Sequence, residues 1–556
     1  MLPLSSRPLQ GGKTETLQVR SLVVGMVIAL ASAGLGYTAR GETAATRTDV
    51  LGSGQAASSD GTLPGQAPLA PGTAGPDGTA GAVVGGPSAV VDSDPVTPGI
   101  QPAPGGPAPG LTTDSGAPGG PGAPGRPGAQ APAPKQPGGQ LSSGPLTASD
   151  QGVTKTGIKL GFLIANTSQL GAAGFKAGIA GDQQKIIKAW MAEFNRTGGV
   201  NGRKVSAVTQ DFDVLSVDNM QAACKTMTRD EKVFSVITAG GYDSVAQLCI
   251  AKENKTPLIS TDPEPEQWYA ESKPYLYSTY MSKDRIARNK ADWLKQGGWL
   301  RPTDKVGVIY HDIPNVAPSV EKSLLPALKR NGITPKTVIK LASDSNQALN
   351  QINNAVLQMR QDGVTFVSFQ MNLIFKSQFM QVAENQNYFP RYDDSDVYFG
   401  CQNFVTAAYP ARSFDKTQCL TGTLGGLQKT YTTNAFTKLA DQVYKRTFPQ
   451  GYATEGDGAE AQEGQRALNY GLGSEILLWH QAAVRAGTQL TRPLWGQAMQ
   501  MTGEFTQQAQ YCSMRFGPDK FDGADQLSVV QFRTEASDGY AARKFRTVRP
   551  CFRNYR

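Results

Sequence analysis

The spacing of apolar residues divides the chain into three regions. Residues 22–39 form one apolar run without a charged side chain, and residues 44–150 show no apolar periodicity. From residue 157 onward, short apolar runs alternate with segments in which apolar residues recur every three or four positions. This alternation predicts strands and helices in turn. Regular folded structure is therefore expected only in the third region.

The third region predicts two successive runs of strand–helix units. The first run predicts strands at 158–164, 204–210, 233–238 and 257–259, and helices at 181–197, 218–228 (Asp218 as N-cap) and 245–254. The second run predicts strands at 305–310, 336–339 and 364–369, and helices at 320–330 and 346–362. Repeated units of this kind favour parallel sheets with right-handed crossovers. The expected fold class is therefore α/β, with two doubly wound parallel-sheet lobes.

The region before the lobes has the composition of a linker. Residues 51–150 contain 23 Gly, 19 Pro, eight charged residues and no aromatic residue. Such a segment cannot bury enough apolar surface to offset the entropy lost on ordering it. We therefore expect an N-terminal segment at 1–43, a disordered Pro/Gly/Ala-rich linker at 44–150, and the folded domain at 151–556.

The N-terminal apolar run predicts export. Arg7, Lys13 and Arg20 precede the run at 22–39. A basic segment followed by an apolar run directs a chain across the membrane. As a helix the run spans about 27 Å, which is the short limit for crossing a bilayer. It predicts either a retained membrane anchor or a signal peptide cleaved after Ala33, and both place the lobes outside the cytoplasmic membrane.

The six cysteines all lie in the region expected to be exported, which predicts disulfides. Fifteen pairings of six cysteines are possible. Cys224 and Cys249 lie on successive helices expected side by side on one sheet face, so they are expected to pair. Proximity in the sequence then favours the pairs Cys401–Cys419 and Cys512–Cys551. No CxxC spacing occurs, so no metal or cofactor is expected.

Charge and histidine content argue against nucleic-acid binding and catalysis. Residues 151–556 carry 47 basic and 37 acidic residues, without a run of four or more Lys/Arg. A mixed surface of this kind predicts no nucleic-acid partner. The only histidines are His311 and His480, and no nucleophile elbow or phosphate-binding loop is present. We therefore do not expect an enzyme.

Several segments resemble the type I periplasmic binding proteins. They are the strand at 158–164, FNRTGGVNGR at 194–203, VFSVITAGG at 233–241 and TPLIST at 256–261. The closer resemblance is to the branched-chain amino-acid (Leu/Ile/Val) receptor-like substrate-binding proteins of ABC transporters. The resemblance extends over about 155–500. It implies two α/β lobes joined by a three-strand hinge, with lobe 1 at about 155–278 and 421–488, and lobe 2 at about 279–420 and 489–556.

In parallel sheets, ligands bind beyond the carboxyl ends of the strands. The loops at these ends predict the ligand-binding residues, which are Ser168, Gln169, Gly241, Tyr242, Asp243, Ser244, Ser260, Thr261 and Asp262 in lobe 1, and Gln370 and Asn372 in lobe 2. Gly240 and Gly241 are expected to let the backbone come close to a ligand, and the N–H groups that open the helix at Asp243 are expected to hold a ligand carboxylate.

Two positions differ from the amino-acid receptors that the chain resembles. The expected return strand at 421–432 contains no acid to pair a ligand ammonium, and no aromatic residue follows the strand at 305–310. Asp243 or Asp262 could supply the missing charge. The expected ligand is therefore a small solute, such as an amino acid, an amide or a related compound.

The expected function is capture of this solute outside the cytoplasmic membrane for an ABC permease. The alternative is a ligand-sensing or surface-interaction module on the same linker, since similar folds also serve receptors. Permease and ATPase genes beside this one would favour transport, and a kinase or regulator gene would favour sensing.

Overall fold

The structure is a computed structural model that describes residues 139–166, 183–214, 216–395, 401, 408–422, 434–452, 459–509, 512–536 and 542–553. The expected N-terminal segment and nearly all of the expected linker lie outside the described residues, as do Ser168 and Gln169. All described residues belong to one compact unit. Within the described ranges, no helix has the length and apolar character needed to cross a membrane.

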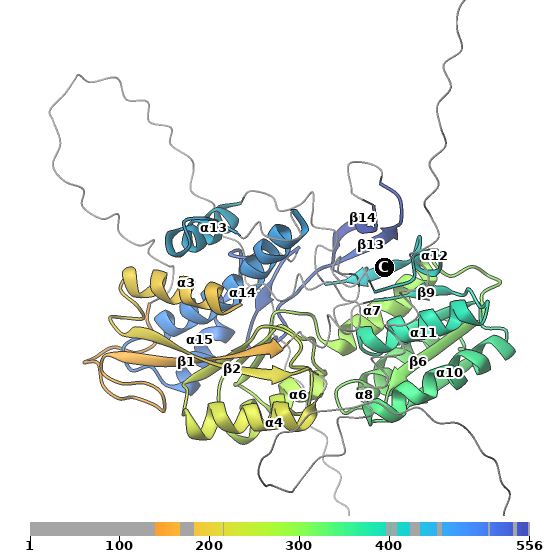
Figure 1. The fold of residues 1–556 in the computed structure, drawn as a ribbon. Helices are drawn as coiled ribbons and strands as arrows, with labels where there is room; N and C mark the ends of the chain where they lie inside the picture. The colour runs from red at the N-terminus through yellow and green to blue at the C-terminus, as the bar shows by residue number, and fades with distance from the viewer. Residues whose placement is uncertain are drawn as a thin grey trace, which may run out of the picture. The chain divides into compact units, whose positions relative to one another are not determined.

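The first lobe is built on a five-stranded parallel sheet with the order β2-β1-β3-β4-β5. Its strands are β1 (Gly157–Asn166), β2 (Lys204–Asp213), β3 (Ser235–Thr238), β4 (Leu258–Ser260) and β5 (Leu276–Ser278). Its helices are α3 (Gln183–Arg196), α4 (Val217–Lys225), α5 (Ala246–Leu248), α6 (Glu266–Glu271), α13 (Ala435–Thr447), α14 (Ala459–Ala486) and α15 (Arg492–Gln500). Helices α3, α13 and α14 cover one face, and α4 lies on the other (Figure 1).

Helix α3 follows the predicted pattern closely. Its buried residues include Ile186, Ile187, Trp190 and Phe194, which recur at helical spacing and pack on the sheet. In α4 the N-cap differs from the prediction. Ser216, not Asp218, accepts the capping hydrogen bond, from the N–H of Asn219. Both residue types cap helices well, so the pattern alone could not choose between them.

The second lobe is built on a seven-stranded sheet with the order β14-β13-β10-β9-β8-β6-β7. Its strands are β6 (Val306–His311), β7 (Thr337–Leu341), β8 (Phe366–Gln370), β9 (Arg391–Asp393), β10 (Gln418–Thr421), β13 (Leu527–Arg533) and β14 (Lys544–Phe552). Its helices are α7 (Lys283–Gln296), α8 (Ala317–Ser319), α9 (Leu325–Arg330), α10 (Ser345–Gln361), α11 (Leu373–Asn385) and α12 (Ala411–Phe414). A small sheet pairs β11 (Gly503–Glu504) with β12 (Arg515–Phe516).

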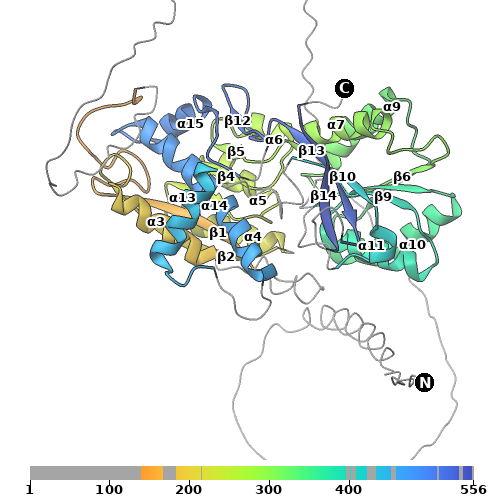
Figure 2. The same ribbon diagram turned by 90° about the horizontal axis from the view of Figure 1, so that it is seen from above.

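The three strands predicted for this sheet, β6, β7 and β8, are parallel as expected, and β9 and β10 continue the parallel order, but β13 and β14 do not. Strand β13 pairs antiparallel with β10, and β14 pairs antiparallel with β13. Figure 2 shows β13, β14 and β10 side by side. The connection at 534–543 is too short to hold a crossover helix, and a short connection of this kind requires an antiparallel pair.

Three segments meet where the chain passes between the lobes. The N–H groups of Ser278 and Gly523 bond to the carbonyls of Phe521 and Ser278, so these two segments run alongside each other. At the end of β10, a Cβ placed on Gly422 would lie 3.6 Å from Ala524 and 4.0 Å from Met281. This arrangement agrees with the expected three-strand hinge.

Two boundaries of the lobes differ from the expected ones. Residues 139–150, expected in the linker, lie against the first lobe: the N–H of Leu141 bonds to the carbonyl of Arg485, and Ser149 Oγ bonds to that of Leu490. Helix α15, expected in lobe 2, packs on α14 and on Tyr277 of the first lobe. The chain therefore returns to the second lobe only after the segment that precedes β13.

All three expected disulfides are present. Cys224 pairs with Cys249, Cys401 with Cys419, and Cys512 with Cys551. The first pair joins α4 to the π-helical segment that continues α5, as the expected helix adjacency required. The third pair joins the segment before β13 to strand β14.

Replacing both Cys224 and Cys249 by Ala should lower the free energy of unfolding by about 3 kcal/mol. The disulfide closes a loop with a sequence separation of 25, and opening this loop restores entropy to the unfolded chain. Denaturant unfolding of the oxidised parent and the variant, followed by fluorescence, measures the difference. An unchanged midpoint at equal slope would contradict the expectation.

Limited proteolysis of the full chain should leave a resistant core whose N-terminus lies at or before Gln140. Residues 141–150 bond to the first lobe, whereas the disorder of the linker before them stays a prediction. N-terminal sequencing and mass measurement of the core locate the cut. A core that begins after residue 150 would show that this segment is not held, and a protected fragment within 60–130 would refute the linker.

Candidate functional site

One carboxylate joins the first-lobe loops that follow β3 and β4. Asp262 Oδ1 accepts a hydrogen bond from the N–H of Gly241 (3.1 Å), and its Oδ2 accepts one from the N–H of Tyr242 (3.0 Å). Gly240 and Gly241 have φ angles of 94° and 79°, which orient these N–H groups and favour glycine. The backbone expected to come close to a ligand at Gly240 and Gly241 therefore presents its next two N–H groups to a carboxylate of the protein itself.

The side chain of Tyr242 lies in the core of the first lobe. It has no exposed surface, its hydroxyl donates to the carbonyl of Met220 (2.5 Å), and its ring packs edge-on against Phe212. Burial raises the pKa of this hydroxyl. The ring and hydroxyl predicted to face a ligand therefore hold the loop after β3 against α4.

The carboxylate of Asp243 is bonded by groups from the second lobe. Its Oδ1 lies 2.7 Å from Nζ of Lys283, the first residue of α7. The same oxygen accepts a hydrogen bond from the side-chain amide of Asn315, in the loop after β6. The side chains of Asp243 and Lys283 are 5% and 2% exposed. This buried carboxylate therefore links the loop after β3 to two elements of the second lobe.

Two further carboxylates share Lys283. Glu264 Oε2 lies 3.7 Å from Lys283 Nζ, and Asp262 is close enough for the ammonium to lower the pKa of its carboxyl. Burial nevertheless raises the pKa of Asp262 to about 6, that of Asp243 to about 7, and that of Glu264 well above its ordinary value. We refer to Asp243, Asp262, Glu264 and Lys283 as the acidic cluster. Its three carboxylates share one ammonium group.

The side-chain amide of Gln247 forms hydrogen bonds to the acidic cluster and to the residues beside it. Its Nε2 donates to Glu264 Oε1 (2.5 Å), Ser260 Oγ (3.1 Å) and the carbonyl of Tyr242 (3.0 Å). Its Oε1 is buried and has no hydrogen-bond partner in the described part of the chain. The amide therefore fixes the orientation of Glu264 while leaving one acceptor unused.

Three of the predicted site residues present buried polar atoms that have no hydrogen-bond partner among the described residues. These atoms are Asp243 Oδ2, Thr261 Oγ1 and Gln370 Nε2. Asp243 and Thr261 follow β3 and β4, and Gln370 ends β8. Since β8 pairs with β6, Gln370 lies at the same sheet edge as the loop that holds Asn315. Buried polar atoms normally have partners, so these three are the strongest candidates for ligand contacts.

The other predicted side chains have partners within the protein. Ser244 Oγ accepts from the N–H of Ala246, and Ser260 Oγ accepts from that of Asp262. Asn372 Oδ1 caps α11 by accepting from the N–H groups of Ile374 and Phe375. These contacts are the turn and cap contacts that such residue types make in any protein.

The sequence patterns did not single out Glu264, Lys283, Asn315 or Glu475. Glu475, on α14, is 2% exposed, and its Oε1 accepts from Thr279 Oγ1 (3.3 Å). Burial raises the pKa of Glu475 well above its ordinary value, and the nearby charge of Asp262 raises it further. The one available signal was the run DPEPE at 262–266, an unusual density of acids directly after a strand.

The second lobe contains two buried ion pairs of its own. Lys290 Nζ lies 2.9 Å from Asp393 Oδ2, and Lys376 Nζ lies 2.6 Å from Asp394 Oδ1, with all four side chains fully buried. Lys290 also donates to Ser368 Oγ. Each carboxylate here has its own ammonium group, so the charges balance within the lobe.

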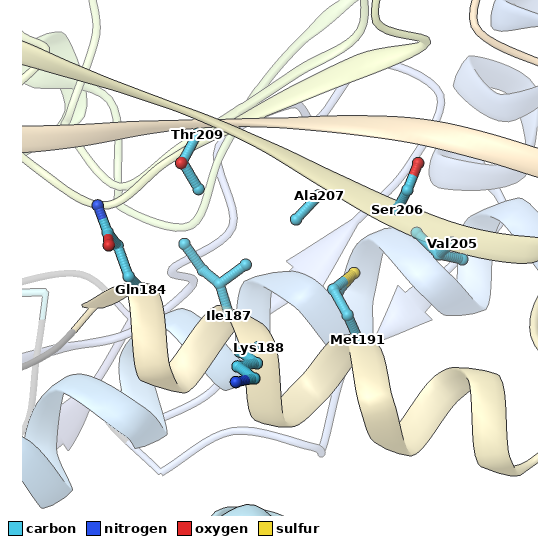
Figure 3. A pocket seen from close by; sticks show the side chains of 8 residues that line it. All are labelled: Gln184, Ile187, Lys188, Met191, Val205, Ser206, Ala207 and Thr209. Carbon is cyan, nitrogen blue, oxygen red and sulfur yellow. The ribbon is translucent and has the colours of Figure 1, made fainter.

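A groove on the outer side of the first lobe lies apart from these loops. It has a volume of about 410 Å³ and lies between α3 and the edge strand β2 (Figure 3). It is lined by Gln184, Ile187, Lys188, Met191, Val205, Ser206, Ala207 and Thr209. None of these residues was predicted as a site residue, and nothing in the structure shows what would cover them.

A model of the periplasmic binding protein family matches residues 157–531. The chain belongs to this family. A search of curated proteins found no match. The family consists of solute-binding proteins rather than enzymes, and the match extends from β1 into β13.

Solved structures show the same fold at low sequence identity. A fatty acid ABC transporter substrate-binding protein from Thermomonospora curvata has 16% identity and a TM-score of 0.54, covering 73% of this chain and 95% of its own. A possible leucine/isoleucine/valine-binding protein from Rhodopirellula baltica SH 1 has 12% identity and a TM-score of 0.51, covering 73% and 98%. A type 1 periplasmic binding protein from Bordetella pertussis Tohama I has 14% identity and a TM-score of 0.51, covering 71% and 100%.

These comparisons agree with the resemblance read from the sequence. The protein is a type I periplasmic binding protein, and family membership and the disulfides both suggest an extracytoplasmic location. The two histidines have structural contacts. His311 lies 3.2 Å from the carbonyl of Ser343, and His480 stacks on Phe194.

Replacing Glu475 by Gln should stabilise the protein at pH 8 and leave its stability unchanged at pH 4. Burial raises the pKa of the Glu475 carboxyl in the folded protein. Between its ordinary pKa and this raised pKa, the folded protein therefore keeps a proton that the unfolded chain loses. Stability from this group is therefore present at low pH and lost as pH rises. We expect a gain of about 1–3 kcal/mol at pH 8, because ionisation of Glu475 in the unfolded chain favours unfolding of the parent, and Gln cannot ionise.

Denaturant unfolding at both pH values checks this expectation. The exposed Glu504 provides the matched Glu-to-Gln control, which should change stability little at either pH. A destabilised E475Q at pH 8 would mean that the carboxylate is ionised and paired in the folded protein.

Proposed function

We propose that this protein captures a small solute between its two lobes and delivers it to an ABC permease. The observation that carries the proposal is the placement of Asp243 Oδ2, Thr261 Oγ1 and Gln370 Nε2, which are buried and have no partner among the described residues. They come from loops of both lobes at the carboxyl ends of parallel strands, which is where such sheets bind ligands. A solute held there would contact both lobes at once.

The hinge and the Asp243 contacts fit a protein that opens and closes. Three crossing segments meet near Met281, Gly422 and Ala524, and rotation about them would move one lobe relative to the other. The bond from Asn315 to Asp243 would form only when the lobes approach, whereas the backbone N–H of Lys283 bonds to the carbonyl of Glu264 at the junction of the lobes. A solute then favours closure by the additional contacts that it makes in the closed state.

The proposal extends to the N-terminal regions of the chain. Residues 22–39 would retain the lobes at the outer face of the cytoplasmic membrane, or direct their export if cleaved. A flexible linker would keep loaded lobes near the permease at roughly millimolar local concentration when its span suits the distance. Removing residues 44–134 would therefore alter uptake and leave the affinity for solute unchanged.

A thermal-shift screen of the full folded part tests the function. The screen would contain amino acids, amides, short peptides, amines and carboxylic acids, because the structural neighbours do not decide the solute class. A solute at 100 times its dissociation constant should stabilise the folded state by about 2.7 kcal/mol. Failure of the whole set to raise the melting temperature would count against solute capture.

Once a solute is found, replacing Thr261 by Val should weaken its binding by about 1–3 kcal/mol. The change removes one hydroxyl while keeping the shape of the side chain, so the buried group that bonds to it would be left unpaired. Calorimetry measures the affinity. Thr209, exposed on β2, provides the matched Thr-to-Val control. Equal binding by T261V and the parent would show that the loop after β4 does not contact the solute.

A further inference from the structure

The end of the chain carries much of the positive charge of the folded domain. Residues 533–556 contain seven basic and two acidic residues, a net charge of +5. Residues 151–556 as a whole contain 47 basic and 37 acidic residues, a net charge of +10. All of 533–556 follows the end of the family match at residue 531. Half of the excess charge therefore belongs to a short segment outside the matched region.

Most of this charge lies along strand β14, at the edge of the seven-stranded sheet (Figure 1). Lys544 lies directly opposite Arg533 of β13, and like charges in opposite positions destabilise a strand pair. Arg543 and Arg549 are also partly exposed, and the side chain of Arg553 is 68% exposed. We refer to Arg533, Arg543, Lys544, Arg549 and Arg553 as the basic strip. From Lys544 to Arg553 it is about 30 Å long.

The basic strip ends beside a second group of cations. Arg553 Nε lies 3.6 Å from Asp525 Oδ2. Arg285 and Lys520 form ion pairs with the same carboxylate, at 3.6 and 3.8 Å, and both also pair with Asp522. Three cationic side chains therefore share two carboxylates at this end, and Arg553 is the most exposed of the three.

The backbone of β14 is a poor template for another strand. Pro550 has no N–H group to donate. The register against β13 shifts twice, so that β14 has one extra residue at Val548 and another between Arg549 and Phe552. Proline, bulges and charged side chains all prevent an edge strand from pairing, and a second copy of β14 would bring like charges together. A partner of the basic strip must therefore be recognised by side chains.

Apolar side chains are exposed among the basic ones. Val548 is 52% exposed, Pro550 is exposed, and Phe552 is partly exposed. The guanidinium carbon of Arg549 lies 4.5 Å from the centre of the Phe552 ring. At a membrane surface, basic side chains attract anionic headgroups while apolar side chains enter the boundary between headgroups and acyl chains. A soluble polyanion would use only the charges, so the mixture favours a membrane.

We propose that the basic strip binds the surface of a membrane that contains anionic phospholipids, with its guanidinium and ammonium groups at the headgroup phosphates and Val548 in the headgroup layer. Arginine is well suited to this contact because its planar fork can bond two phosphate oxygens at once. The contact is separate from the solute site and from the apolar run at 22–39. It would hold the second lobe at the membrane surface.

The test measures binding to vesicles of stated composition. It uses the folded part of the chain, residues 139–556, because the apolar run at 22–39 is expected to bind vesicles on its own. The vesicles contain phosphatidylcholine alone, or phosphatidylcholine and phosphatidylglycerol in equal amounts, and co-sedimentation measures the bound fraction. We expect binding to the anionic vesicles to be at least about tenfold tighter at low salt, and this preference to fall as salt screens the charges.

Two charge substitutions locate the contact. K544Q and R549Q should each weaken binding to the anionic vesicles about fivefold, because each removes one charge near the membrane surface. K336Q and R330Q are the matched controls and should bind like the parent. Lys336 and Arg330 are both exposed, and they lie on the segment that leads into β7, at the opposite edge of the same sheet.

A third substitution separates a membrane from a soluble polyanion. V548S should weaken binding to the anionic vesicles severalfold and leave any binding to soluble polyglutamate unchanged, because only the membrane offers an apolar layer to this side chain. Val338, 45% exposed on β7, provides the matched Val-to-Ser control. Circular dichroism establishes that each variant is folded.

A preference for anionic vesicles that is reduced in K544Q and R549Q and kept in the controls supports the proposal. Equal binding of the unmodified protein to both kinds of vesicle overturns it, whether or not the variants fold. Binding to polyglutamate without binding to vesicles also overturns it and points to an acidic polymer or protein as the partner. None of these outcomes depends on the solute screen, so the proposed function is tested separately.

Discussion

One ammonium group, Nζ of Lys283, is shared by three buried carboxylates where the two lobes meet. Its position depends on the start of α7, and the carboxylates depend on the loops after β3 and β4. Removing a single partner from a buried charge group leaves uncompensated charge and is strongly destabilising. The start of α7 and the loops after β3 and β4 must therefore keep their positions relative to one another. The Asp262 bonds to the loop after β3 and the Gln247 bonds to Glu264 extend the same constraint into the first lobe.

The two lobes handle buried charge differently. The second lobe pairs Lys290 with Asp393 and Lys376 with Asp394, and each pair is neutral within the sheet. At the carboxyl edge of the first-lobe sheet, three carboxylates share the one ammonium group of Lys283. A neutral network needs nothing from outside and can be purely structural. In a network with more carboxylates than ammonium groups, the net charge changes when a ligand or a proton binds. For this reason the functional proposal rests on the first-lobe loops rather than on the second-lobe ion pairs.

The segment that most clearly resembles the family has a structural role. In FNRTGGVNGR, the side-chain amide of Asn195 bonds to the backbone of the edge strand β2. Its Nδ2 donates to the carbonyl of Val205, and its Oδ1 accepts from the N–H of Val205. Arg203 has no exposed surface and donates to the carbonyls of Thr154 and Thr147. Gly199 allows the turn to close, since a Cβ there would meet the carbonyl of Arg203 at 1.9 Å. The motif therefore protects the sheet edge and anchors the residues before β1.

The sequence by itself determined the α/β class, the two lobes, most strands and helices, and the cysteine pairing, because these follow from local periodicity and from adjacency along the chain. It also placed Asp243, Thr261 and Gln370 at strand ends. Only the tertiary structure decided that Tyr242 lies in the core, that Asp262 occupies the N–H groups of its neighbouring loop, and that α15 joins the first lobe. Lys283, Asn315 and Glu475 come from segments distant in sequence, and a local pattern carries no information on the charges that folding buries around them.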